Sequence, residues 1–283
     1  MAFDSSRIPQ SLKEAYKNRR CGVYVGDGAS KPAGLPLWSG MLQAMLDRAV
    51  AEHLVDEKTR KEYEALIGNP SKSLMVASAL KDVLGRYFDD FIRATFVAPK
   101  PKPTQLHHGL VKLTDLQFVI TTNYDALIER AYQAIDPDVV VCTFRDIGAT
   151  QSSLSNREFF ILKAHGDATK VGNGIVMTDA DYRELLYRQR AYQAMLASMF
   201  TMYTIVFVGA SMADPELQLL LSYISDVFLP TSGPQHYALM AEEDTGEIER
   251  RHWRKDFNVN IIPVSKANDY AEVAEFVEAL GQG

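Results

Sequence analysis

Two residues of this sequence combine useful side-chain chemistry with a position just after an apolar run. Asn123 follows the run at 118–120, and His165 follows the run at 159–162. A carboxamide donates and accepts hydrogen bonds at once, which suits a ribose hydroxyl or a water. An imidazole titrates near neutral pH and serves as a general base with little tuning. The pair indicates a site that activates a hydroxyl or a water, although a lone histidine at a strand end is more often structural.

Asp125 has two interpretations that the sequence leaves open. It precedes a helical stretch that we expect to begin at Ala126, and aspartate is a natural N-cap. Its carboxylate is equally placed to face a ligand beside Asn123, because both residues follow the same predicted strand.

Two glycine-containing segments also follow apolar runs. Gly26, Gly28 and Ser30 follow residues 21–25, a position where the backbone of an α/β protein approaches a pyrophosphate. A dinucleotide fingerprint would have a third glycine at position 31, where Lys31 stands, so a purely structural turn remains an alternative. The segment 209–215 is similar. Its Gly209 and Ser211 could admit a second phosphate or ribose, while Asp214 and Pro215 are expected to start a helix.

The elements that must position these residues alternate along the chain. Short apolar runs predict strands at 21–25, 117–120, 139–142, 159–162, 203–208, 236–240 and 259–262. Helical stretches are expected at 125–134, 181–202, 214–228 and 269–280. Strands that are apolar throughout are covered on both faces, which is typical of a parallel sheet. The pattern predicts an α/β fold with a Rossmann-like, doubly wound, mostly parallel sheet, whose ligands bind at the strand carboxyl ends.

One interval lacks strands. From about residue 38 to residue 113 only amphipathic helical pattern is present. Because no low-complexity linker separates this interval from the rest, we expect a helical insertion within a single domain spanning residues 1–283.

Composition excludes several classes of protein. The net charge is −6, which disfavours dedicated nucleic-acid binding, and two cysteines cannot form a four-cysteine zinc site. No metal-ligand spacing is evident, and His107 and His108 lie among leucines, as on a structural helix face. The chain has no run of 18 apolar residues and no signal-peptide pattern at its start. We therefore expect a cytoplasmic protein without metal or membrane contact.

Five segments of the chain, in order, resemble the successive NAD motifs of the sirtuin superfamily. They are residues 26–30, 33–36, 121–125, 165–166 and 209–211. Residues 178–182 and 209–215 further resemble the divergent bacterial branch of that superfamily, which serves in anti-phage defence.

The resemblance implies a Rossmann-like sheet that binds NAD, with the nicotinamide pocket near Asn123 and His165. The equivalent asparagine and histidine are required for catalysis in the family, and the aspartate matched by Asp125 lies beside that pocket. The first glycine loop of the family contacts the pyrophosphate and ribose. By this resemblance, NAD contacts are expected from Gly26, Asp27, Gly28, Ser30, Leu35, Pro36, Trp38, Thr122, Gly209 and Ser211.

The sequence also departs from the protein-deacylating sirtuins. Their Asp-Phe-Arg run is replaced by residues 37–39, Leu-Trp-Ser, and the glutamine of their Thr-Gln-Asn motif is replaced by Thr122. Their zinc ribbon, which helps to frame the acyl-peptide groove, needs more cysteines than this chain has. We therefore expect an NAD hydrolase that releases nicotinamide and ADP-ribose, depleting NAD in abortive infection during anti-phage defence.

Two other functions remain as alternatives: an NAD-dependent protein deacylase, and a non-catalytic module that senses NAD or ADP-ribose. Whether the ADP-ribose product is linear or cyclic stays open. Family precedent implies control of an NAD hydrolase by homo-oligomerisation or by a regulatory partner such as a HerA-family hexameric ATPase. The apolar helices within residues 38–113 are the expected interface.

Overall fold

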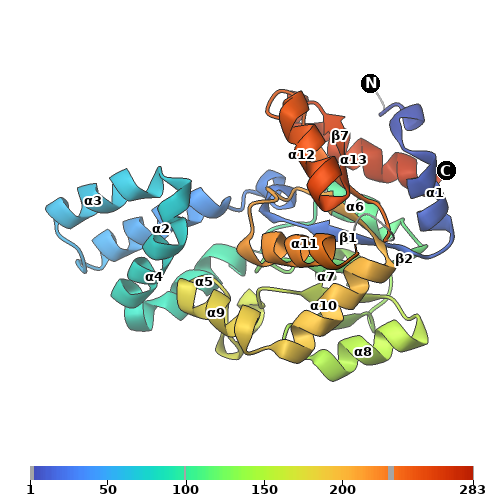
Figure 1. The fold of residues 1–283 in the computed structure, drawn as a ribbon. Coiled ribbons are helices and arrows are strands. Elements are labelled where there is room, and N and C mark those ends of the chain that lie inside the picture. The colour runs from blue at the N-terminus through green and yellow to red at the C-terminus, as the bar shows by residue number, and fades with distance from the viewer. Residues whose placement is uncertain (1–2, 99, 229–232, 283) are drawn as a thin grey trace.

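The computed structural model describes residues 3–98, 100–228 and 233–282. Within these residues, seven strands form a single sheet in which every pairing is parallel, in the order β3-β4-β2-β1-β5-β6-β7 (Figure 1). The strands are β1 (Cys21–Val25), β2 (Leu116–Thr121), β3 (Val140–Thr143), β4 (Phe160–Lys163), β5 (Thr204–Val208), β6 (His236–Ala241) and β7 (Val259–Val264). The predicted α/β, Rossmann-like parallel fold is confirmed, and each predicted strand is present.

Helices cover both faces of the sheet. They are α1 (Gln10–Lys17), α2 (Trp38–Ala51), α3 (Glu57–Ile67), α4 (Ser73–Leu84), α5 (Phe88–Phe96), α6 (Gln105–Val111), α7 (Leu127–Gln133), α8 (Ile147–Asn156), α9 (Asp179–Tyr187), α10 (Arg190–Met202), α11 (Pro215–Phe228), α12 (Glu247–Phe257) and α13 (Ala267–Gln282). The core on one face is built with α1, α6, α7 and α13, and the core on the other with α9 to α12. β1, β2, β4 and β5 are buried along their whole length, which explains their uniformly apolar sequences.

The long interval without strands forms a lobe beside the sheet. Helices α2 to α5 project to one side in Figure 1 and share a third hydrophobic core with residues of the site loops. The last helix of the interval, α6, instead packs on the sheet layer, where Leu106 and Leu110 join the core beside α13. None of the helices in the described residues is long and apolar enough to cross a membrane.

The prediction of one continuous helix at 181–202 is wrong, because the structure has two helices, α9 and α10, separated by Arg188 and Gln189. No glycine or proline marks the break. Tyr182 and Tyr192 each reach a carboxylate at the start of α11. Ten residues of continuous helix would separate the two tyrosines by about 15 Å along its axis. Tertiary contacts with one helix end therefore favour two helices over one.

His236 is a buried, neutral histidine at the start of β6. Its Nδ1 accepts a hydrogen bond from the amide of Ile205 in β5 at 3.1 Å. Burial lowers the pKa of His236 from 6.5 to about 4, because the interior disfavours the charged ring.

This lowered pKa makes the fold sensitive to acid. The unfolded chain binds the proton more tightly, so the contribution of His236 is complete above pH 6.5 and is lost as the pH falls toward 4. We expect the step from pH 7 to pH 4.5 to lower the free energy of unfolding by about 2 kcal/mol through this residue. Urea unfolding of His236→Gln should show a weaker acid dependence than the wild type. His53→Gln, at an exposed position, should change the dependence less than His236→Gln does; equal slopes in all three proteins would contradict the assignment.

Candidate active site

Two adjacent strands bring Asn123 and His165 to the same edge of the sheet. β2 and β4 pair with Thr121 opposite Lys163, and the amide of Ala164 donates to the carbonyl of Thr121 at 2.8 Å. Asn123 and His165 each lie two residues beyond that pair. Both therefore follow the carboxyl ends of parallel strands, where open α/β sheets bind their ligands.

The Asn123 side chain is buried and joins the loop after β2 to the loop after β1. Its Nδ2 donates to the carbonyl of Gly26 and to Ser30 Oγ, both at 3.0 Å. Its Oδ1 is buried and has no hydrogen-bond partner among the described residues. A buried acceptor without a partner costs free energy, so this oxygen indicates a place for a donor such as a ligand hydroxyl or a water.

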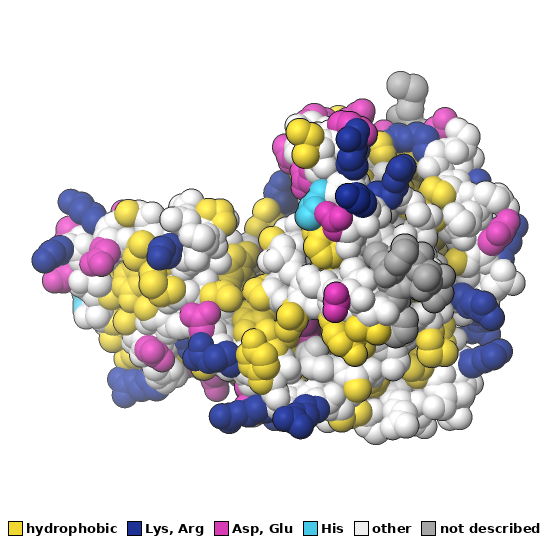
Figure 2. Space-filling model, viewed as in Figure 1, with side chains coloured by type: hydrophobic (Ala, Val, Ile, Leu, Met, Phe, Trp, Pro, Cys, Tyr) yellow, Lys and Arg dark blue, Asp and Glu magenta, His cyan; other side chains and the backbone are white. Residues whose placement is uncertain are grey.

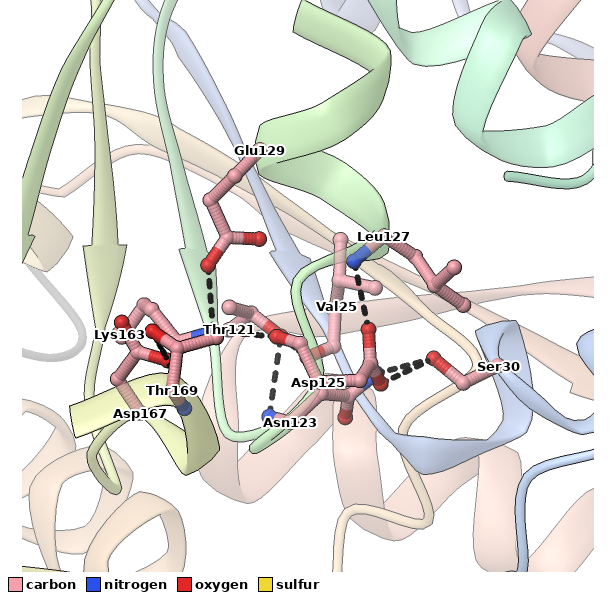
Figure 3. A network of polar contacts seen from close by, with 10 residues as sticks. All are labelled: Val25, Ser30, Thr121, Asn123, Asp125, Leu127, Glu129, Lys163, Asp167 and Thr169. Carbon is pink, nitrogen blue, oxygen red and sulfur yellow. Dashed lines mark hydrogen bonds and ion pairs between the residues drawn. The ribbon is translucent and has the colours of Figure 1, made fainter. Parts of the chain in front are cut away.

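Asp125 connects the same network to helix α7 (Figure 3). Its Oδ2 accepts from Ser30 Oγ at 2.8 Å, and its Oδ1 accepts from the amide of Leu127 at 2.9 Å. The expected N-cap position is wrong: the helix begins at Leu127 with Ala126 as its N-cap, and Asp125 instead closes a turn just before the helix. Both oxygens are thus engaged inside the protein, and Asp125 acts on the site through Ser30, which in turn accepts from Asn123.

A fully buried lysine that the sequence analysis missed joins this region. Lys163 Nζ donates to the carbonyl of Asp125 and to Glu129 Oε1, and it lies 3.9 Å from Asp167 Oδ1 (Figure 3). Burial alone would lower the pKa of Lys163, but the Glu129 and Asp167 carboxylates outweigh it and raise that pKa above its usual value. The charged ammonium therefore holds three segments together at the end of β4.

The glycines after β1 and β5 are needed for contact between two loops. The amide of Gly28 donates to the carbonyl of Gly209 at 2.9 Å. A Cβ on Gly26 would lie 2.6 Å from the same carbonyl oxygen, and Gly209 has a positive φ of 61°. Glycine is required where backbones approach this closely. The amide of Gly28 therefore donates within the protein in this structure. The two loops nevertheless lie at the strand ends where we expected the phosphates to bind.

The remaining predicted ligand contacts surround this edge. The Asp27 carboxylate accepts from the amide of Trp38 at 2.9 Å and so caps α2, and burial raises the pKa of Asp27. The amide of Thr122 donates to the carbonyl of Val25 at 3.2 Å. Leu35 is buried in the core of the helical lobe, Pro36 is half-buried, and Ser211 is exposed.

The His165 side chain contacts residues of α9 and of the start of α11. Its carbonyl accepts from the amide of Val176, and its Nε2 lies 3.4 Å from Glu216 Oε2 and 3.7 Å from Asp214 Oδ2. No hydrogen bond joins His165 to Asn123 directly. Burial alone would lower the pKa of His165, but the two carboxylates raise it overall. Asp214 also caps α11 through the amide of Leu217 at 3.0 Å, as expected.

Sequence reasoning missed Glu129 and Glu216 as well as Lys163. Lys163 could have been found in the sequence, because it is a cation at the end of an otherwise apolar strand. Such a buried charge needs a partner of opposite charge. In the part of the chain that the structure describes, one group of metal-binding side chain types gathers, with atoms of His165, Asp214 and Glu216 within 4.8 Å of one another. Both carboxylates already accept hydrogen bonds from neighbouring side chains, so protein contacts account for their placement.

A hollow of about 690 Å³ lies beside the site. It is formed between the loop after β1 and the segment that precedes α6, and its lining includes Leu35, Lys100, Lys102 and Thr104. Of the predicted ligand contacts, Leu35 alone lines it. The hollow therefore adjoins the predicted pocket and does not contain Asn123 or His165.

Comparison with known proteins places this chain in a family. Residues 117–262, slightly more than half of the chain, match the family model described as the SIR2-like domain. The protein belongs to the SIR2-like family, as the motif order after β1, β2, β4 and β5 indicated.

Its relatives include larger proteins. The chain is 26% identical over 226 residues to Defense-associated sirtuin 2 of Bacillus subtilis, covering 76% of this chain and 20% of the relative. It is 25% identical over 308 residues to NAD(+) hydrolase ThsA of Enterococcus faecium, covering 98% of this chain and 58% of the relative. A solved structure of Sir2Tm bound to a propionylated peptide shares 14% identity and a TM-score of 0.49, covering 95% of both chains. The chain thus spans between a fifth and three fifths of these two curated relatives.

Removing the buried ammonium should destabilise the fold. Lys163→Met leaves Glu129 buried without its partner, and we expect a loss of about 3 kcal/mol in the free energy of unfolding. Urea denaturation measures this loss. The double variant Lys163→Met/Glu129→Leu removes both charges and should regain part of the loss. As a control, Lys61→Met removes an exposed helix cation and should change stability by less than about 0.5 kcal/mol. A Lys163→Met variant as stable as Lys61→Met would show that the buried ion pair is not needed.

Proposed function

We propose that this protein is an NAD hydrolase, which cleaves the bond between nicotinamide and ribose and depletes NAD in anti-phage defence. One observation carries the proposal. At the edge of the sheet where the family motifs converge, the buried Asn123 Oδ1 makes no hydrogen bond with described residues, and the buried His165 follows the neighbouring strand. Membership of the SIR2-like family and the names of the curated relatives support NAD as the substrate.

In the proposed reaction, Asn123, His165 and Asp125 have different roles. As the glycosidic bond breaks, its electron pair returns to the nicotinamide nitrogen and positive charge develops on the ribose. Asn123 Oδ1 accepts a hydrogen bond from the attacking water or a ribose hydroxyl. The water oxygen bonds to the anomeric carbon, and His165 takes the proton that the water loses. Asp125 favours the cationic ribose electrostatically and holds Ser30 in place. The scheme requires no metal ion.

The loops after β1 and β5 form the rest of the proposed NAD site. Asp27, Gly26 and Gly28 shape the first loop, and Gly209 and Ser211 shape the second. Leu35, Pro36, Trp38 and Thr122 border the same edge. We propose that the two loops hold the phosphates and riboses of NAD, and that the nicotinamide end lies near Asn123.

Activity of this kind needs control, because unrestrained NAD loss harms the cell. We propose a cytoplasmic protein regulated by homo-oligomerisation or by a partner such as a HerA-family hexameric ATPase. The lobe of α2 to α5 is the proposed contact surface. Figure 2 shows hydrophobic side chains at its surface, and exposed members include Leu54 and Met75.

The function is tested by incubating the purified protein with NAD and measuring free nicotinamide. We expect release without an acetylated peptide. Release only when the peptide is present would identify a deacylase instead. Protection from thermal unfolding by NAD without any product would identify a sensing module. No release and no binding would overturn all three functions.

Variants of the two central residues test the mechanism. We expect Asn123→Ala and His165→Ala each to lower kcat by about 100-fold or more, because each removes a group that contacts the reacting atoms. The control is Gln117→Ala, which truncates another buried amide at the opposite end of β2, where it donates to the carbonyl of Glu158. Gln117→Ala should keep wild-type kcat in the folded protein. Full activity in both site variants would refute the assignment.

A further inference from the structure

Behind His165 lies a buried polar cluster that three helices and a strand assemble. Asp214 and Glu216 come from the start of α11, and both carboxylates face His165 Nε2. Tyr182 of α9 packs its ring edge-on against the imidazole, with centroids 5.4 Å apart. Tyr24 of β1 lies close enough to both carboxylates for their charges to raise its pKa, in addition to the effect of burial. Its buried hydroxyl has no hydrogen-bond partner among the described residues.

Other hydrogen bonds hold both carboxylates in place. Asp214 Oδ2 accepts from the Tyr182 hydroxyl at 2.7 Å while its Oδ1 caps α11. Glu216 Oε1 accepts from Gln193 Nε2 at 2.6 Å, and the Tyr192 hydroxyl lies 3.4 Å from its Oε2. The amino end of α11 stabilises two negative charges at this position. The carboxylates are therefore fixed where they face the imidazole. Burial raises the pKa of Glu216, and the hydrogen bond and charge of His165 oppose that rise.

We propose that Glu216 and Asp214 are positioning residues that orient the His165 ring and keep its proton on Nε2. This inference rests on the proposed NAD hydrolysis and adds residues to that same site. Carboxylates only accept hydrogen bonds, so a ring nitrogen that faces two of them carries the hydrogen. The other nitrogen, Nδ1, then holds the free lone pair and is the atom that takes the proton from the attacking water.

The cluster also stabilises the product of that proton transfer. When Nδ1 accepts a proton, the ring becomes an imidazolium next to Asp214 and Glu216, and these carboxylates favour it. A carboxylate behind a catalytic histidine has this role in serine hydrolases. The other titratable groups around the ring, Tyr24, Tyr182 and Tyr192, all have raised pKa values because of burial, so they stay neutral at working pH.

Amide variants test the inference without removing side-chain volume. Glu216→Gln and Asp214→Asn each remove one charge, and asparagine still caps a helix. We expect kcat for nicotinamide release to fall about tenfold or more in each variant, with KM changed less than about twofold. Since less negative charge lowers the pKa of His165, the acidic limb of the kcat profile should move to lower pH. Glu247→Gln, in the first turn of α12, loses a similar helix-end charge away from His165 and should match the wild type.

The outcomes separate this inference from the proposed function. A wild-type protein that releases no nicotinamide refutes the function. An active wild type with Glu216→Gln and Asp214→Asn unchanged in kcat and pH profile overturns the positioning role alone. Activity lost with EDTA and restored by a divalent ion would also overturn it, in favour of a metal site.

If the amide variants fail to fold, the inference can still be tested by a measurement on the wild-type protein. Long-range ¹H–¹⁵N correlation spectra report which ring nitrogen of a neutral histidine carries hydrogen. The His165 signals are assigned by their loss in His165→Gln. We expect the Nε2–H tautomer, and an Nδ1–H tautomer would overturn the inference.

Discussion

A single buried charge organises the edge of the sheet at which the candidate site lies. The Lys163 ammonium has no solvent contact, and an isolated charge in that position would be too costly to keep. It is compensated by the carbonyl of Asp125 and the carboxylates of Glu129 and Asp167. These partners belong to the loop after β2, to helix α7 and to the loop after β4. The geometry of both site loops therefore depends on satisfying one cation.

Two polar networks lie at the carboxyl ends of the strands near this cation. The first links Asn123, Ser30 and Asp125 and reaches the first residue of α7, whose amide donates to Asp125. The second surrounds His165 with groups from β1 and α9 to α11. Both networks are satisfied except at a few atoms, among them Asn123 Oδ1 and His165 Nε2. Of these atoms, Asn123 Oδ1 lies where the hydroxyl or water of the proposed reaction would donate its hydrogen bond.

The glycines of the family motifs serve packing as well as any ligand. Gly26, Gly28 and Gly209 bring the loops after β1 and β5 into backbone contact. β1 and β5 are neighbours in the sheet and pair along their whole length. A side chain at any of these glycines would separate the loops, and with them the Ser30 network from the start of α11. The same residues therefore couple the two halves of the edge.

The sequence alone determined the seven strands, their parallel arrangement and the positions of Asn123, Asp125 and His165 at strand ends. Continuous apolar runs and family motifs are local patterns, and local patterns predict such features. Only the tertiary structure decided which charges meet. Lys163 and Glu129 are 34 residues apart, and Glu216 lies on a helix that follows another strand. The break between α9 and α10 has no local cause either. Pairings across elements follow from packing and from the cost of an unpaired buried charge, and neither appears in the spacing of one segment.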